Sequence, residues 1–188
     1  MPNWRQVFSG KIWQIQQSTE TDGRVFERAL RAPGSRLIVV KDNKILLQRE
    51  KRHELNGETD IRLPGGKVFD TLEEFESFDG DIVEASRLSI TKEAFEEAGM
   101  VVSTEKLQYI GVDVLGATCS WDLHYWLAEE FEMHSDGAQF HESESKEIEG
   151  SFWVSFEEAK EIVLDRNKFS ESRSAMVLVR FMNERLIS

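Results

Sequence analysis

Residues 91–100 of the chain read Thr-Lys-Glu-Ala-Phe-Glu-Glu-Ala-Gly-Met, and this stretch decides the fold. At helical spacing Glu93, Glu96 and Glu97 fall within one arc of about 100°, because residues three and four apart are neighbours on a helix surface. The opposite side is taken by Leu88, Ile90, Thr91, Ala94, Phe95 and Ala98. The spacing therefore predicts a helix with a core face and a densely acidic face. We expect it to end at Gly99, since glycine readily adopts the left-handed backbone of a C-terminal cap.

The three carboxylates repel one another at this spacing, and Lys92 is the one nearby cation. An ordinary solvated acidic face explains the helix taken alone. The alternative is a bound hard cation such as Mg²⁺ or Mn²⁺, which prefers oxygen ligands and would neutralise the charge.

A loop upstream of this helix favours the interpretation that the glutamates bind a cation. Leu63-Pro64-Gly65-Gly66-Lys67-Val68, together with Lys92–Met100, resembles the Nudix box, whose second half runs Arg-Glu, apolar, any, Glu-Glu, any, Gly, apolar. The chain departs from the box in having Lys92 for the arginine and in inserting residues 70–81. The spacing between Glu84 and Lys92 matches the box, so Glu84 is the candidate for its first glutamate.

The resemblance implies an α+β Nudix fold, with a mixed β-sheet sandwiched between helices. It implies that Glu93, Glu96 and Glu97 bind Mg²⁺ or Mn²⁺ with the help of the Gly65 carbonyl, and that Gly66 lies against the substrate. The activity expected of such a site is metal-dependent hydrolysis of a phosphoric anhydride.

The segment before the box is similar to the branch of the family that cleaves ADP-ribose and nucleoside diphosphate sugars. Residues 1–34 are expected to form an antiparallel β extension that makes a homodimer, and residues 35–188 the hydrolase domain. An extra sheet on a monomer is the alternative. Strands are also predicted around Leu37–Val40 and Ile45–Gln48, at 107–114, 123–128 and 152–154, with helices from residue 82, from residue 156 and at about 171–186.

Three side chains are candidates for substrate binding. Arg49 and Arg52 follow a predicted strand, and the planar fork of arginine suits phosphate oxygens. The resemblance implies that an arginine here contacts the diphosphate, while a solvated surface role explains Arg52 equally well. Trp121 is a candidate for stacking on a base or sugar, although the segment around it lacks a proline usual in the ADP-ribose enzymes.

The acidic segment before Phe152 supplies the candidate general base. The family often draws a glutamate from this loop, and Glu147 is our first choice, with Glu144 next and Glu142 and Glu149 nearby. A solvated acidic loop with no catalytic base is the alternative.

Composition limits the partners and the compartment. A net charge of −12 argues against binding of nucleic acid or an anionic membrane, so local cations must offset this field around a phosphate substrate. The single cysteine, Cys119, excludes an internal disulfide and favours the cytoplasm. We therefore expect a cytoplasmic hydrolase of a small nucleotide diphosphate, of the ADP-ribose or GDP-mannose type. The rivals are a nucleoside triphosphate or dinucleoside polyphosphate hydrolase and a non-catalytic nucleotide-sugar sensor.

Overall fold

The computed structural model describes residues 3–135, 137–138 and 147–187. Its central sheet has the order β12-β5-β4-β10-β8, with β6 paired to β5. The strands are β4 (Gly34–Lys41), β5 (Lys44–Arg52), β6 (Glu58–Arg62), β8 (Gln108–Asp113), β10 (Leu123–Ala128) and β12 (Ile148–Ser155). β4 and β10 run parallel and the other pairs are antiparallel, so the sheet is mixed as predicted.

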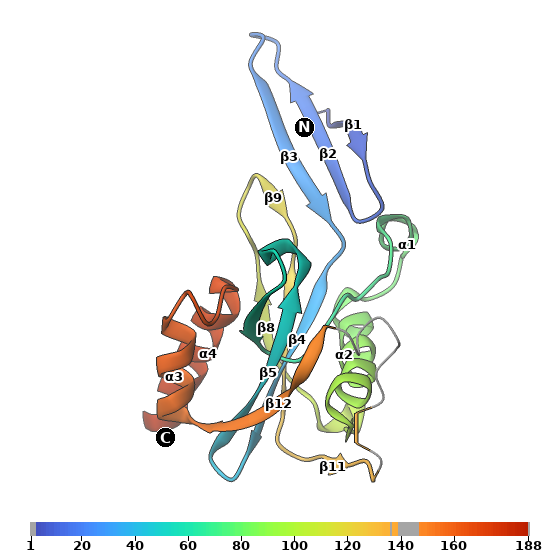
Figure 1. Ribbon diagram of the computed structural model, residues 1–188. Coiled ribbons are helices and arrows are strands. Elements are labelled where there is room, and N and C mark those ends of the chain that lie inside the picture. The colour runs from blue at the N-terminus through green and yellow to red at the C-terminus, as the bar shows by residue number, and fades with distance from the viewer. Residues whose placement is uncertain (1–2, 136, 139–146, 188) are drawn as a thin grey trace.

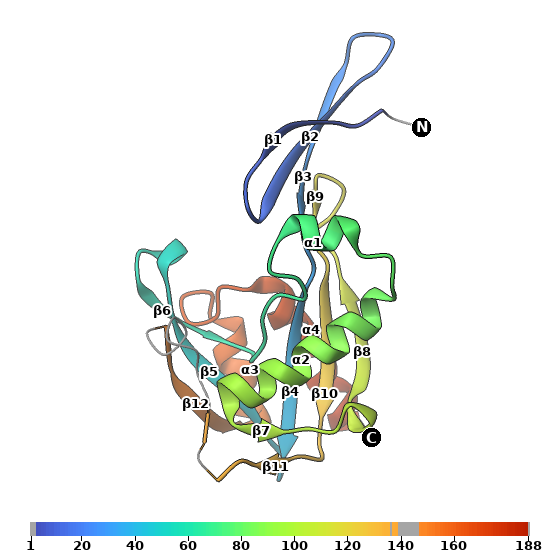
Figure 2. The same ribbon diagram turned by 90° about the vertical axis from the view of Figure 1, so that its right-hand side faces the viewer.

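Helices cover both faces of this sheet (Figures 1 and 2). α2 (Ile82–Ala98) packs on one face through a core that includes Leu37, Ile90 and Trp126. α3 (Phe156–Leu164) and α4 (Ser172–Ile187) pack on the other face through a second core around Ile38 and Leu178. β4 and β10 are almost wholly buried because both of their faces are covered. The predicted α+β arrangement of a sheet between helices is confirmed.

Local signals set the ends of these elements. Asp42 and Asn43 both have positive φ and form the tight turn between β4 and β5. The Asp81 side chain caps α2, and Gly99 ends it in the left-handed conformation. Ser155 begins α3 with a full capping box. The spacing of Asp81 and Glu84 is that of a capping box, but the Glu84 carboxylate pairs with Arg87 at 2.6 Å.

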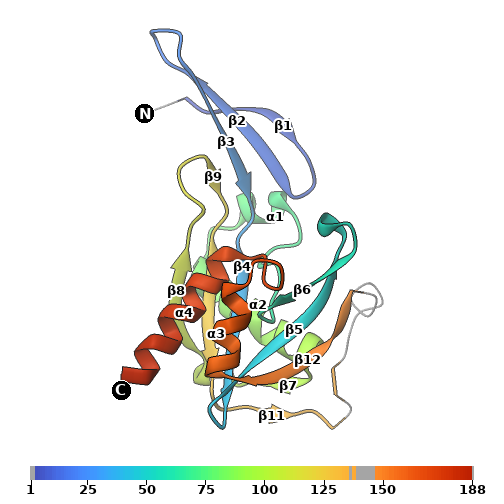
Figure 3. The ribbon, with the colours of Figure 1, turned by 60° about the vertical axis from the view of Figure 1, so that its left-hand side comes forward.

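A second sheet projects from the body at its N-terminal end (Figures 1 and 3). It has the order β1-β2-β3-β9, formed by β1 (Arg5–Ser9), β2 (Trp13–Thr19), β3 (Val25–Arg31) and β9 (Cys119–Ser120). β1, β2 and β3 pair antiparallel as expected, while the short β9 adds a parallel strand from the middle of the chain. Val7, Phe8, Val25 and Phe26 are exposed on this sheet.

The inserted segment 70–81 forms a short helix, α1 (Leu72–Ser77), beneath the N-terminal sheet. A capping box between Thr71 and Glu74 starts it. Phe75 and Phe78 pack on Phe69, with ring centroids 5.6 and 5.0 Å away. The aromatic side chains of the insertion therefore pack on the residue that precedes it.

Short elements complete the fold. β7 (Met100–Val101) pairs with β11 (Glu132–Met133), and single 3-10 turns occupy His53–Leu55 and Thr104–Lys106. None of the helices in the described part of the chain combines the length and the apolar character needed to cross a membrane.

The central sheet divides between β4 and β5, at the level where the loop at residues 63–66 lies beside β4. β4 and β5 pair through Val40–Ile45 and Lys41–Lys44, and β5 then pairs with β6. The loop at residues 63–66 lies along the edge of β4 that this leaves open: Leu37 N–H donates to the Pro64 carbonyl and Ser35 N–H to the Gly66 carbonyl, both at 2.9 Å. The split thus places the glycine pair beside α2.

Candidate functional site

Glu97 on α2 meets the backbone of this loop. Its Oε2 accepts a hydrogen bond from Gly65 N–H at 2.9 Å. Gly65 has φ of +139°, and a Cβ there would lie 2.3 Å from the Ser35 carbonyl oxygen and 3.0 Å from the Arg36 Cα. Both the conformation and the contact require glycine, so the sequence pair Gly65-Gly66 is what allows the loop to reach the helix.

Glu93 meets the second glycine. A Cβ on Gly66 would lie 2.0 Å from Glu93 Oε1, so the carboxylate occupies the space that a side chain would fill. The carbonyls of Pro64 and Gly66 are bound to β4, whereas the Gly65 carbonyl takes no part in that pairing. Two carboxylates and the Gly65-Gly66 backbone are therefore brought together.

Burial and neighbouring carboxylates both disfavour the ionised form of Glu97. Burial is the main cause that raises the pKa of Glu97 to about 8, and the neighbouring charge of Glu93 adds to it. The Gly65 N–H acts in the opposite direction, the carboxylate of Glu50 raises the pKa further, and the charge of Arg36 lowers it. A bound cation would remove this imbalance by favouring the ionised carboxylates.

The donor set fits Mg²⁺ or Mn²⁺, hard cations that take oxygen ligands. Within the described residues, His, Cys, Asp and Glu side chains do not form a preassembled cluster of three or more that could hold a metal ion. Mg²⁺ usually takes only one or two carboxylates and completes its shell with water and substrate phosphates. Glu93, Glu97 and the Gly65 carbonyl meet that requirement.

Glu96 lies on the same face of α2 and is paired with Lys92 at 3.1 Å. The Glu96 side chain is 12% exposed, while that of Lys92 is 67% exposed. In the Nudix box the residue at position 92 pairs with the first glutamate. Here Lys92 pairs with Glu96, and Glu84 pairs with Arg87.

Arg52 and Arg49 leave β5 on opposite faces, since side chains alternate along a strand. Arg52 binds Glu50 at 2.5 Å and Glu54 at 3.1 Å, and Glu50 is close enough to Glu97 to raise its pKa. Arg49 lies on the face of α3 and α4, with its guanidinium 4.0 Å from the centre of the Phe152 ring. The structure therefore brings Arg52, and not Arg49, to the side of the α2 carboxylates.

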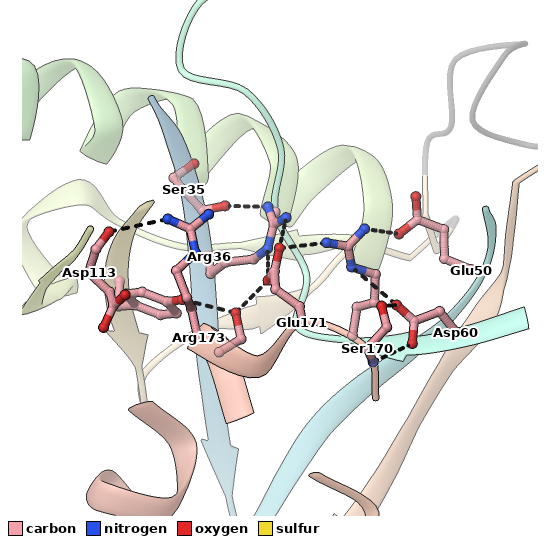
Figure 4. Close-up of polar contacts among 12 residues, drawn as sticks. Ser35, Arg36, Glu50, Asp60, Asp113, Ser170, Glu171 and Arg173 are labelled. Atoms are coloured by element: carbon pink, nitrogen blue, oxygen red, sulfur yellow. Dashed lines mark hydrogen bonds and ion pairs between the residues drawn. The ribbon is translucent and has the colours of Figure 1, made fainter. Parts of the chain in front are cut away.

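Further arginines gather here that the sequence reasoning missed. Burial is the main cause that lowers the pKa of Arg31, and the charges of Arg36, Arg52 and Arg62 lower it as well. Arg31 thus lies close enough to three other arginines to be affected by their charges, although the protein as a whole has a net charge of −12. A buried network joins Arg36 and Arg62 to Glu171 (Figure 4). The one sequence signal for Arg36 is a charge beside the apolar run Leu37–Val40.

The Trp121 ring is in contact with two arginine side chains of the protein. The guanidinium carbons of Arg31 and Arg173 lie 4.2 and 4.4 Å from the centre of its ring, and Trp13 approaches it edge-on at 6.0 Å. Arg173 also donates to the Trp121 carbonyl at 2.6 Å. The indole therefore orients two arginines in this structure.

Glu147 is exposed and stands directly before β12. Its carbonyl accepts a hydrogen bond from Lys51 N–H at 2.7 Å, next to the pair formed by Ile148 and Glu50. It therefore lies at the end of β5 that carries Glu50 and Arg52. Glu149 is paired with Lys51 at 3.1 Å. The other candidates in this segment, Glu142 and Glu144, lie outside the described residues.

No family model and no curated protein matches the chain. Among solved structures the chain is similar to an ADP compounds hydrolase, with a TM-score of 0.70 and 15% sequence identity over 98% of this chain and 91% of that one. It is also similar to a MutT NUDIX hydrolase from Burkholderia pseudomallei, with a TM-score of 0.47 and 22% identity over 67% of this chain and 84% of that one. The first similarity spans both sheets and confirms the Nudix fold that the sequence predicted.

Proposed function

We propose that the chain is a metal-dependent hydrolase that cleaves the diphosphate linkage of a nucleoside diphosphate sugar or a related nucleotide derivative into two phosphate monoesters. The observation that carries the proposal is the seating of Glu93 and Glu97 against Gly65 and Gly66, beside a group of arginines. The fold supports it as well, because the ADP compounds hydrolase named above matches almost the whole chain.

In this proposal Glu93, Glu97 and the Gly65 carbonyl hold Mg²⁺ or Mn²⁺, and Glu96 assists. The cation, when bound, neutralises the diphosphate and activates the attacking water. Burial of Glu97 matches this role, since a carboxyl group that is costly to ionise alone gains most from a cation.

Arg52 is the arginine that we assign to the substrate phosphates, with Arg31 as a second donor. Both lie in the group of cations beside the site, and the planar guanidinium binds two phosphate oxygens at once. In this structure Arg52 is ion-paired with Glu50 and Glu54, so a phosphate would have to replace at least one of these carboxylates. Glu147 is the proposed base that takes the proton of the attacking water.

The experiment is a hydrolysis screen of ADP-ribose, GDP-mannose, UDP-glucose and NADH with Mg²⁺, followed by product analysis. Two monophosphate products are expected from at least one substrate. Glu97→Gln should lower the rate at least about 100-fold, because it removes a ligand of a cation worth several kcal/mol in the transition state. Glu161→Gln, an exposed glutamate of α3, is the matched control and should leave the rate unchanged.

Two results would contradict the proposal. The first is an absence of cleavage of all four substrates by a folded, Mg²⁺-saturated protein. The second is a Glu97→Gln variant that keeps activity within about twofold of the wild type, which would remove Glu97 from the metal site.

A further inference from the structure

Glu171 lies between the separated parts of β4 and β5, immediately before α4 (Figure 4). Its side chain is only 9% exposed, yet it carries a charge among several donors. Oε2 accepts from Arg36 Nε at 2.9 Å and from Ser174 Oγ at 2.5 Å. Oε1 accepts from Arg36 Nη2 at 3.0 Å and from Arg62 Nη2 at 2.6 Å. One carboxylate thus binds arginines from β4 and from β6.

The β4 side of this network leads to the carboxylates of α2. Arg36 Nη1 donates to the Ser35 carbonyl at 2.9 Å. That carbonyl is the atom against which Gly65 is packed, and Gly65 N–H in turn binds Glu97. A displacement of Arg36 would therefore be transmitted through two backbone contacts to the proposed metal ligand.

The β6 side leads to the proposed phosphate ligand. Arg62 Nη1 lies 3.7 Å from Glu50 Oε2, and Glu50 Oε1 accepts from Arg52 Nη1 at 2.5 Å. Arg62, Glu50 and Arg52 thus form a chain of alternating charge that starts at Glu171. Because β4 and β5 no longer pair at this level, Glu171 supplies a direct connection between the two sides of the split.

We infer that Glu171 is a positioning residue, which sets the spacing between the metal-binding carboxylates of α2 and the phosphate-binding Arg52. The inference rests on the function proposed above. Two-pronged pairing with Glu171 fixes the direction of the Arg36 guanidinium as well as its distance, and the single contact from Arg62 Nη2 ties the β6 side to the same carboxylate. Displacements of about 1 Å at the reacting groups cost up to about 100-fold in rate.

The alternative is that Glu171 only stabilises the fold. Removing one partner of a buried ion pair leaves an uncompensated charge, so Glu171→Gln is expected to lower stability under either interpretation. A test must therefore separate folding from spacing.

The test compares Glu171→Gln with the double variant Glu171→Gln/Arg36→Gln, which also removes the buried guanidinium that loses its ion pair in Glu171→Gln. Each variant is assayed at a temperature where circular dichroism shows it fully folded. A positioning role predicts that kcat falls at least about tenfold in both variants, while the melting temperature of the double variant recovers toward that of the wild type. Recovery of kcat together with stability would overturn the inference.

Ser170→Ala is the matched control in the same loop. It removes the 2.7 Å bond from Ser170 Oγ to Asp60 but leaves both arginines on Glu171. Its stability is expected to fall while kcat stays within about twofold, since one hydrogen bond to the Asp60 carboxylate is lost while the contacts of Arg36 and Arg62 with Glu171 remain. An equal fall of kcat in Ser170→Ala would show that any loosening of this loop impairs the site, and would also overturn the inference.

Amide hydrogen exchange provides a readout that does not depend on activity. Glu171→Gln should speed exchange both in residues 34–37 and in residues 60–66, whereas Ser170→Ala should affect at most the second segment.

If the wild-type protein cleaves none of the screened substrates, the proposed function fails, and the exchange data still decide whether Glu171 connects the two sides. Unchanged exchange in residues 34–37 would overturn that connection. If Glu171→Gln does not fold, Arg36→Lys takes its place in both measurements, because it keeps the charge but loses the two-pronged pairing with Glu171. Unchanged kcat and unchanged exchange in residues 34–37 of that variant would count equally against the inference.

Discussion

At the scale of single residues, the site depends on a glycine that has no room for a side chain. Gly65 combines a φ of +139° with a virtual Cβ position 2.3 Å from the Ser35 carbonyl oxygen. The close approach allows its N–H to bind Glu97. Strained conformations of this kind persist only where the surrounding structure requires them, and they are common at functional sites.

Gly65→Ala is therefore expected to destabilise the protein by about 1–3 kcal/mol or more and to abolish most hydrolysis. The matched control is Gly111→Ala, because Gly111 has a similar φ of +146° but open space around the virtual Cβ. Thermal unfolding and the hydrolysis assay measure both effects. If the two variants lose the same stability and activity, the conformation alone, and not the packing on Ser35, explains the need for glycine.

Glu97 leads to a prediction about pH. Burial and the charge of Glu93 raise its pKa from an ordinary 4.5 to about 8 in the metal-free protein. Between these values the folded state keeps a proton that the unfolded chain has released, so the free energy of unfolding falls as pH rises. Glu97→Gln should flatten this slope and raise the melting temperature of the metal-free protein at pH 8. The measurement is thermal unfolding in a chelator from pH 5 to 9. A slope that survives the substitution unchanged would assign the effect to other groups.

At the scale of elements, β12 and the turn before it bring the candidate base to the end of β5. Glu147 is exposed and anchored through its carbonyl to Lys51. The helix glutamates are assigned to the cation, so a base from another element is required if the reaction uses one. General bases contribute typically about 10²–10⁴-fold to a rate.

Glu147→Gln is accordingly expected to lower kcat at least about 100-fold with little change in KM, and to flatten the acid limb of the pH profile. Glu149→Gln is the natural control, because Glu149 pairs with Lys51 and Thr59. Single Glu→Gln changes at positions 142 and 144 complete the series. Near-normal rates in all four variants would mean that no carboxylate of this segment acts as the base.

At the scale of the whole molecule, the N-terminal sheet projects away from the body (Figure 3), and several of its apolar side chains are exposed. Val7 is 47% and Phe8 58% exposed, and both lie on β1, which forms one edge of its sheet. Exposed apolar edges usually mark an interface, since proteins otherwise blunt them.

We predict that the protein is a homodimer that uses this sheet. Light scattering at micromolar concentration should give twice the 21.7 kDa of one chain. Phe8→Glu should shift the mass toward the monomer, because it places a charge in the interface. Leu164→Glu, at a 63% exposed position of α3 outside the sheet, should leave the mass unchanged. A monomeric wild-type protein would refute the prediction.

Much of this molecule follows from near neighbours in the sequence. The extent of α2 depends on the periodicity of residues 82–98, the Asp81 cap and Gly99, and the turn before β5 depends on Asp42 and Asn43. The shared face of the α2 glutamates was likewise predicted, because the geometry of a helix fixes which of its side chains lie together. These features rest on interactions within a few residues, and the sequence alone determined them.

Only the tertiary structure decided how distant charges combine. Arg36 and Glu171 are 135 positions apart, and no local pattern connects them. Alternation along β5 separates Arg49 from Arg52, but which of them faces α2 depends on how the strand packs between two helix layers. Trp121, a candidate for stacking on a base or sugar, has the guanidinium groups of Arg31 and Arg173 against its ring. Each case depends on chain reversals that bring remote segments together, and burial then makes those pairings strong.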